Sequence, residues 1–271
     1  MRLQKIGISF VMALSFLFTA SCASLGGGAP SEEEINAEAL KAYNEVKTKS
    51  KISQNREWSE MVQRVSRRIA AASGENFQWE AILIEDPQPN AWCMPGGKIA
   101  VYTGIMPVLK TEGALAAVLG HEVAHATQRH GQKQYARAIQ ENQTGLIIGV
   151  AAVVGGQVLC KTEQCRTWTQ LGGAAAGLAI TFFNRKYSRG DESEADNVGQ
   201  KFMAKAGYDP SESISLWERM SAANGGKSVP EWMSTHPSDS HRRAQLNQTL
   251  PQAQVLYSQA PQKFGIGAQI R

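Results

Sequence analysis

The pentapeptide His121-Glu122-Val123-Ala124-His125 constrains this chain more than any other feature. It lies in a stretch from Thr111 to His130 whose composition predicts a helix. Residues i and i+4 are about 40° apart around a helix, so both imidazoles leave one face, one turn apart. This spacing lets His121 and His125 bind a single Zn²⁺, while Glu122 can reach a water on the same metal as general base.

A hydrolytic zinc site needs a third protein ligand and an open fourth position. One common pattern places Gly seven and His ten residues after the first His, but those positions hold Gln128 and Gly131. A second pattern takes a Glu from a later helix, and residues 191–196 supply it. Glu192 and Asp196, at i and i+4, share one helix face. We therefore expect Glu192 to bind the metal and Asp196 to accept a hydrogen bond from a ligating histidine, most readily His121.

Two other side chains near these motifs compete for a role. Glu194 lies about 160° around the helix from Asp196, so both cannot serve the same site. His130 follows His125 by five residues, which corresponds to about 140° around a continuous helix. His130 is therefore not expected to share the metal, and an interaction with the C-terminal helix dipole is the simpler expectation.

Several motifs occur together in the order typical of one peptidase family. They are Asn90-Ala91, Pro95-Gly96-Gly97, His121-Glu122-x-x-His125, Ser188-Arg189 with Glu192-x-Glu194-Ala195-Asp196, and Thr235-His236-Pro237 with Arg242. Over residues 55–250 the chain resembles the family of the Ste-type CAAX prenyl proteases, the HtpX heat-shock proteases and the mitochondrial Oma peptidase. It is most similar to periplasmic bacterial members of the LoiP and BepA kinds.

The resemblance implies a zinc metalloendopeptidase with one Zn²⁺ per chain, held by His121, His125 and Glu192. It also implies that the substrates are misfolded or misassembled proteins of the bacterial envelope. Cys93-Met94, in the strand before the Gly-Gly turn, departs from the family pattern. That position is not a ligand, so the departure does not affect the expected chemistry.

His236 has two possible roles. Because it precedes Pro237, which disfavours helical backbone in the preceding residue, we expect it in a loop. It could donate a hydrogen bond to the oxyanion of the tetrahedral intermediate, with Arg242 as a second positive group nearby. Alternatively, it could bind the zinc as a fourth ligand and displace the water, as the resemblance to the BepA kind implies. We favour the first role, because a permanent fourth ligand would leave the motif without chemistry.

The strand predicted from Lys98 to Thr103 is a candidate edge for binding an extended substrate by strand addition. Asn90, Gly97 and Lys98 are accordingly the expected substrate-binding residues. Binding of this type recognises the backbone more than the side chains, which suits a quality-control peptidase. The alternative is a lipid-anchored, chaperone-like assembly factor whose peptidase activity is held off.

The N-terminus predicts export. Arg2 and Lys5 precede an apolar run, residues 6–18, that is too short to span a bilayer comfortably. The residues that follow, Thr19-Ala20-Ser21-Cys22, resemble a bacterial lipobox. We expect residues 1–21 to be a signal peptide and 22–30 a tether lipidated on Cys22, with an ordinary signal peptide as the alternative. No Asp follows Cys22, which favours the periplasmic side of the outer membrane over the inner membrane.

Charge and cysteine content are consistent with a secreted enzyme. The net charge of the whole chain is +4, and it falls to +2 without the two basic residues of the signal peptide. No basic stripe with interleaved aromatic residues occurs, so nucleic acid is not an expected partner. Cys160 and Cys165 flank a short polar loop, and a disulfide between them is feasible in an oxidising compartment.

The expected fold class is α+β, a mostly helical zincin-like metalloprotease domain at residues 31–258 with a small β-sheet beside the active-site helix. We predict helices at 31–47, 57–72, 111–130, 191–206, 211–224 and 238–250, and strands at 77–85 and 91–103. Gly131 and Pro251 are expected to end their helices, and residues 259–271 to form a loosely ordered tail. The apolar arms within residues 145–183 predict a helical hairpin. A buried core pair is favoured over a lid on the cleft or a membrane contact.

Overall fold

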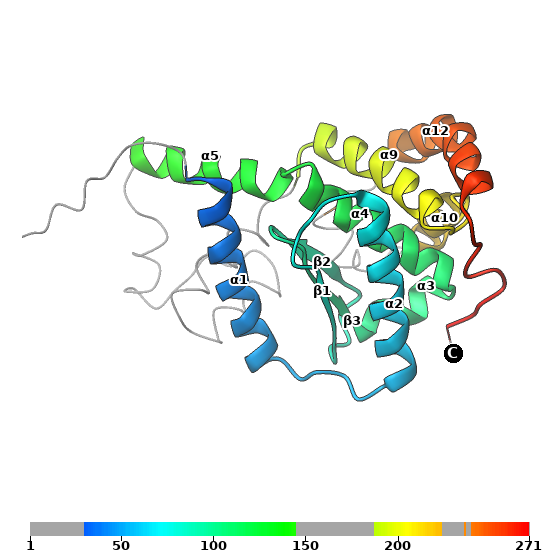
Figure 1. Cartoon of the computed structure of the whole chain (residues 1–271), viewed down its shortest axis with the longest axis horizontal. Coiled ribbons are helices and arrows are strands. Elements are labelled where there is room, and N and C mark those ends of the chain that lie inside the picture. The colour runs from blue at the N-terminus through cyan, green and yellow to red at the C-terminus, as the bar shows by residue number, and fades with distance from the viewer. Residues whose placement is uncertain (1–29, 145–186, 224–235, 237–239, 271) are drawn as a thin grey trace, which may run out of the picture.

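The computed structural model describes residues 30–144, 187–223, 236 and 240–270. It confirms the predicted α+β class, with many helices and one small sheet (Figure 1). The helices are α1 (Glu32–Lys49), α2 (Arg56–Ser73), α3 (Met106–Leu109), α4 (Glu112–Thr127), α5 (His130–Thr144), α9 (Arg189–Lys205), α10 (Glu212–Ala223) and α12 (Ser240–Gln259), with a short 3-10 turn at Thr103–Ile105. The strands are β1 (Glu80–Ile84), β2 (Ala91–Met94) and β3 (Lys98–Tyr102).

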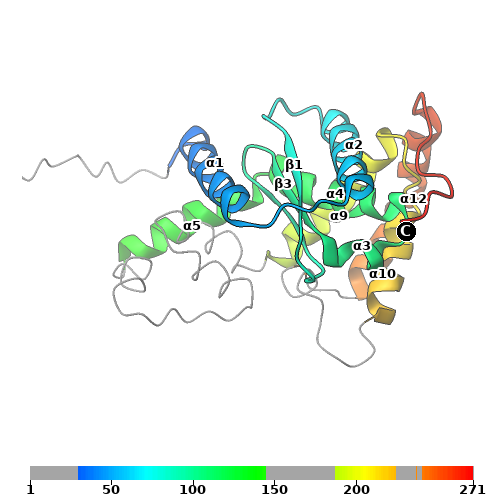
Figure 2. The same ribbon diagram turned by 90° about the horizontal axis from the view of Figure 1, so that it is seen from below.

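The sheet separates two layers of helices. Its strands lie in the order β1-β3-β2, with β1 parallel and β2 antiparallel to β3. Because successive side chains of a strand point to opposite faces, Ile99 and Val101 pack in the core with α2 and α4, whereas Ala100 and Tyr102 pack with α1. Figure 1 and Figure 2 show α1 on one face of the sheet and α2 with α4 on the other.

The expectation that Lys98–Thr103 forms a free edge is wrong. Strand β3 is hydrogen-bonded to β1 on one side and to β2 on the other, so it has no unpaired backbone to offer a substrate. The sequence could not show that β3 is the central strand. In chain order β3 comes after β1 and β2, yet in the sheet it lies between them. In the described part of the chain, β2 has β3 as its single partner strand and is the edge strand on the side of the sheet away from β1.

Helices α4 and α9, which make the most extensive contact between any two elements of the described residues, approach each other through glycines. A Cβ on Gly120 would lie 2.7 Å from the carbonyl oxygen of Gly199, and a Cβ on Gly199 would lie 2.7 Å from the backbone of Gly120. Only hydrogen at both positions lets the two backbones come this close. Gly120 directly precedes His121, so this contact sets the distance between the HExxH helix and the helix that carries Glu192.

The HExxH helix ends earlier than its sequence predicts. Helix α4 stops at Thr127, Arg129 adopts a left-handed conformation with φ of 58°, and α5 begins at His130 and runs through Gly131. The Arg129 guanidinium makes two hydrogen bonds to Glu75, of 2.6 and 3.2 Å, and contacts Glu32 at 3.1 Å. These contacts offset the unfavourable backbone of Arg129, so the break occurs two residues before the predicted stop.

The C-terminal region is more ordered than we expected. Helix α12 continues through Pro251 to Gln259, because Leu246 and Ala253, two turns apart on either side of the proline, are both buried. After the helix, Phe264 N–H donates to the Gly207 carbonyl and Ile270 N–H donates to the Lys110 carbonyl. The described tail, residues 260–270, is therefore held against the domain, and the prediction of a loosely ordered tail is wrong.

Other predictions concern residues outside the described part of the chain. They are the signal peptide and Cys22, the hairpin at residues 145–183, and the disulfide between Cys160 and Cys165. Of the helices that the structure describes, none combines the length and the apolar character needed to cross a membrane.

The glycine contact predicts a large effect of a small substitution. Gly120→Ala should lower the free energy of unfolding by about 1–3 kcal/mol, because the added methyl group meets backbone that cannot rotate away. The matched control is Gly190→Ala in α9, where a Cβ would lie 3.7 Å from the nearest neighbour, the Ser188 hydroxyl. Urea unfolding of both variants in the same metal-free buffer is the measurement. Equal midpoints for Gly120→Ala and the wild type would show that α4 and α9 are not in tight contact.

Candidate metal centre

Four buried side chains bring their donor atoms together at the centre of the domain. They are His121 and His125 from α4, Glu192 from α9, and His236 from the segment between α10 and α12, and each offers one donor atom within 4.8 Å of the others. The Nε2 atoms of His121 and His125 are 3.0 Å apart, and His236 Nδ1 lies 3.2 Å from His121 Nε2. The three predicted ligands thus meet in one place, together with His236.

The distances among these donors fit a tetrahedral metal ion. Ligands at 2.0–2.1 Å from a tetrahedral centre lie about 3.3 Å from one another. Glu192 Oε1 is 3.0 Å from His236 Nδ1 and 3.6 Å from His125 Nε2, and Glu192 Oε2 is 3.5 Å from His121 Nε2. Together with the two nitrogen–nitrogen distances, these values bracket the tetrahedral spacing. Three imidazole nitrogens and one carboxylate oxygen form a donor set that suits Zn²⁺.

The buried charges of this region also call for a cation. Glu122, Glu192 and Asp196 are each at most 5% exposed. The buried side chain with a fixed positive charge that contacts this cluster is Arg242. Three carboxylates against one guanidinium leave two excess negative charges, which a divalent cation would balance. Glu192 Oε2 is also buried without a well-aligned hydrogen bond, although Arg242 Nη1 lies 2.7 Å away. The residues present therefore fit a bound dication.

The pKa values of the two α4 histidines reflect this environment. Burial lowers the pKa of His121, but hydrogen bonds to Asp196 and Glu192 outweigh it and raise the pKa to about 9. In the absence of a metal, a proton on His121 thus supplies part of the missing positive charge. Burial and the neighbouring His121 hold the pKa of His125 well below its usual value. His125 therefore stays neutral, as a metal ligand must be.

Asp196 and Arg242 hold the ligands in position. Asp196 Oδ1 lies 3.0 Å from His121 Nδ1, the contact that the i, i+4 spacing of Glu192 and Asp196 predicts. Arg242 makes two hydrogen bonds to Asp196, of 2.6 and 2.7 Å, and its guanidinium lies 4.2 Å from the centre of the Trp217 ring. Arg242 is thus committed to carboxylates, and the expectation that it assists an oxyanion does not fit these contacts.

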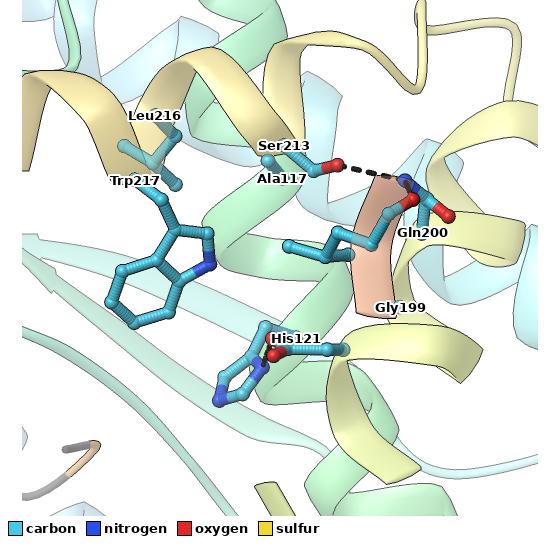
Figure 3. Close-up of a pocket in the computed structure, with 9 residues that line it drawn as sticks. Ala117, His121, Gly199, Gln200, Ser213, Leu216 and Trp217 are labelled. Carbon is cyan, nitrogen blue, oxygen red and sulfur yellow. Dashed lines mark hydrogen bonds and ion pairs between the residues drawn. The ribbon is translucent and has the colours of Figure 1, made fainter. Parts of the chain in front are cut away.

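The side of His121 that faces α10 is closely packed. A small cavity there is lined by Ala117, Gly199, Leu216 and Trp217, among others (Figure 3). The cavity has room for about one water molecule. A peptide substrate therefore has to reach the cluster from another side.

Glu122, the predicted base, is 2% exposed and lies beside the cluster. Its Oε1 atom is 3.4 Å from His236 Nε2. Strand β2 packs against α4, the helix that carries Glu122, and burial, then the charge of Glu122, raise the pKa of Cys93 in that strand. His236 therefore lies between the metal ligands, through Nδ1, and the predicted base, through Nε2.

Two residues near the cluster were misjudged or missed from the sequence. His130 is 1% exposed, and its Nδ1 lies 2.9 Å from His125 Nδ1, because the break after Thr127 turns it back toward α4. His130 is not one of the four donors, as expected, but the expectation that one continuous helix reaches it is wrong. Tyr187 stacks on His125 with ring centres 3.8 Å apart. Its position just before Ser188, the N-cap of the ligand helix, was the one available signal.

The remaining predicted residues are not among the four donors. Glu194 is exposed on α9 and contacts His130 rather than the cluster. Asn90 directly precedes β2, and Gly97 forms the turn into β3 with φ of 84°, where a side chain would collide with Trp79. Lys98 is buried, and its ammonium group donates to the Gln78 carbonyl. Gly97 and Lys98 therefore stabilise the turn and the sheet.

Comparison with known proteins agrees with this geometry. Residues 53–250 match the profile of peptidase family M48. The mitochondrial metalloendopeptidase OMA1 of Schizosaccharomyces pombe is 39% identical over 200 residues, which are 72% of this chain and 53% of that protein. Human OMA1 is 32% identical over 182 residues, 65% of this chain and 33% of its own length.

A bacterial relative has lower identity. The beta-barrel assembly-enhancing protease of Yersinia pestis is 28% identical over 193 residues, 69% of this chain and 38% of that protein. The chain thus spans about half or less of the length of these relatives. Its match nevertheless includes both α4 and α9, with all the predicted ligands that they carry. On the profile match and the identity to OMA1, the chain belongs to peptidase family M48.

Proposed function

We propose that this protein is a zinc-dependent endopeptidase of the bacterial cell envelope that degrades misfolded or misassembled proteins. The observation that carries the proposal is the convergence of His121, His125 and Glu192 beside the buried carboxylate of Glu122. Bound Zn²⁺ would polarise a water molecule and lower its pKa. Glu122 would accept the proton of that water at a carboxylate oxygen and pass it to the leaving amine.

The edge of β2 is the part of the sheet that suits an extended substrate. Its outer side has no partner strand among the described residues, and β2 packs against α4, the helix that carries Glu122. Strand addition at this edge would use main-chain hydrogen bonds, with little demand on side chains. Substrate recognition of this type supports unfolded proteins as the substrate class.

His236 supports a second candidate function, an assembly factor with its peptidase activity held off. The contacts of His236 resemble those of a fourth ligand, because Nδ1 is 3.2 Å from His121 Nε2 and 3.0 Å from Glu192 Oε1. Its Nε2 atom at the same time contacts Glu122. A histidine in this position leaves no open ligand position for water and engages the base. We therefore now favour the inhibitory role of His236 over the oxyanion role.

Location in the envelope is supported by the N-terminal residues and by the Yersinia relative. The OMA1 relatives are mitochondrial by name, so the family alone does not decide the compartment. We propose that Cys22 carries the lipid anchor, on the periplasmic side of the outer membrane.

The peptidase itself is tested with casein and purified full-length protein, with and without a zinc chelator. Glu122→Gln should retain Zn²⁺ but lose about 10²–10⁴-fold in cleavage rate, because an amide cannot accept the proton. Glu192→Ala should lose both Zn²⁺ and cleavage, and exposed Glu218→Ala on α10 serves as the matched control. Each variant is also made in a His236→Ala background, so that inhibition cannot hide activity. Chelator-resistant cleavage by Glu122→Gln would exclude the proposed mechanism.

Whether turnover rises or falls in His236→Ala decides between the two roles of His236. His236→Ala should raise turnover of a peptide substrate at equal zinc occupancy, because it frees the fourth position and Glu122. Loss of an oxyanion donor would instead lower turnover by about 10²–10³-fold. Turnover within error of the wild type would contradict both roles.

The proposed anchor predicts that a fatty acid is attached to Cys22. Metabolic labelling with a fatty acid should mark the wild-type protein, while Cys22→Ser should be unlabelled and released from membranes or left unprocessed. Cys93→Ser is the control, since Cys93 is buried and should not affect labelling. Equal labelling of Cys22→Ser and the wild type would rule out lipidation at this position.

A further inference from the structure

His125 has a buried hydrogen-bonding partner that is separate from the Asp196–Arg242 pair. His125 Nε2 faces the other ligands, and its second ring nitrogen, Nδ1, lies 2.9 Å from His130 Nδ1. His130 Nε2 in turn lies 3.2 Å from Glu194 Oε2 and 3.6 Å from Asp191 Oδ1. The atoms thus form a line from the metal ligands, through two imidazoles, to carboxylates on the first turns of α9.

The direction of the hydrogen bonds follows from metal binding. A histidine that offers Nε2 to a metal carries its proton on Nδ1, so His125 is the donor toward His130. His130 must then accept at Nδ1 and carry its own proton on Nε2, where Glu194 accepts it. Both tautomers are fixed by this one chain of contacts, and no other assignment satisfies all three groups.

We propose that His130 is a positioning residue for the metal centre, which holds the tautomer and ring orientation of His125 and links them to Glu194. This inference rests on the proposed metal site. His130 would do for His125 what Asp196 does for His121, with an imidazole inserted between the ligand and the carboxylate. Partners of this kind orient ligating histidines and raise their basicity.

The fold is arranged to bring His130 to this place. In a continuous helix, a residue five positions after His125 would point away from it. The left-handed backbone of Arg129 interrupts the helix, and the contacts of Arg129 with Glu75 hold the turn. Tyr187 stacks on the face of the His125 ring, so the ring is held both in its plane, by His130, and from above.

The chain also couples the two helices that supply the ligands. His130 begins α5, directly after α4, whereas Glu194 and the ligand Glu192 lie on α9. Because His130 is 1% exposed while Glu194 is exposed, the imidazole is shielded and its far end reaches the surface. Metal affinity should therefore depend on Glu194 even though Glu194 does not reach the cluster.

The test is the affinity of purified full-length protein for Zn²⁺, measured by competition with a chromophoric chelator. His130→Ala should weaken Zn²⁺ binding about 10–100-fold, the usual loss for a partner of a ligand. His130→Asn should recover most of that loss, because its amide oxygen can take the place of Nδ1 as acceptor. Exposed His241→Ala is the matched control and should bind Zn²⁺ as the wild type does.

A double-mutant cycle separates positioning from a general loss of structure. Glu194→Gln should weaken Zn²⁺ binding in the wild-type background and have no further effect in His130→Ala, because the chain is already broken. Thermal unfolding of the metal-free variants shows whether folding has changed. Additive effects, wild-type affinity of His130→Ala, or equal weakness of His130→Ala and His130→Asn would each overturn the proposal. None of these readouts depends on peptidase activity, so failure of the proposed function would be seen separately.

Discussion

The metal centre depends on the close packing of α4 against α9. Two of its donors lie on α4 and one lies on α9, and the backbones meet where Gly120 faces Gly199. Donor atoms must lie within a few tenths of an ångström of their required positions to share one small ion. A contact between two backbones fixes the helix separation more firmly than a contact between flexible side chains would. The glycines therefore act on the chemistry of the site without supplying a donor atom.

Burial of excess negative charge is the second constraint on the site. Glu122, Glu192 and Asp196 lie in the interior, and the single guanidinium of Arg242 is paired with two of them. Buried charge is tolerated when a counter-charge and hydrogen bonds compensate its lost hydration. A dication supplies that compensation, so metal binding and the stability of this part of the fold are linked. The pairing of Arg242 with carboxylates also explains why it is better placed to organise ligands than to meet an oxyanion.

His236 and His130 give the same cluster two different kinds of control. His236 contacts the ligands and Glu122 directly, so in the proposed inhibitory role its position would decide whether water and the base are available. His130 contacts the outer nitrogen of His125, so it acts on the quality of the metal site and not on access to it. A peptidase that meets folded proteins would need restraint on access and a metal site that persists while access is restrained. The two histidines are consistent with these separate needs.

The sequence by itself determined the local chemistry of this protein. The i, i+4 spacing of His121 and His125, and of Glu192 and Asp196, fixes which side chains share a helix face, because helix geometry depends on neighbours a few residues apart. The same local rules predicted the helix at 31–47 and the α+β class, and the structure has both, the helix as α1.

Tertiary structure decided the rest. The insertion of β3 between β1 and β2, the burial that carries α12 through Pro251, and the approach of His236 to the cluster all depend on contacts between distant segments. The break at Arg129 is the clearest case: its salt bridges to Glu75 and Glu32, far back in the chain, turn His130 toward His125. The local pattern of residues contains no information about such distant partners. The free energy of contacts with those partners outweighs the local conformational preference.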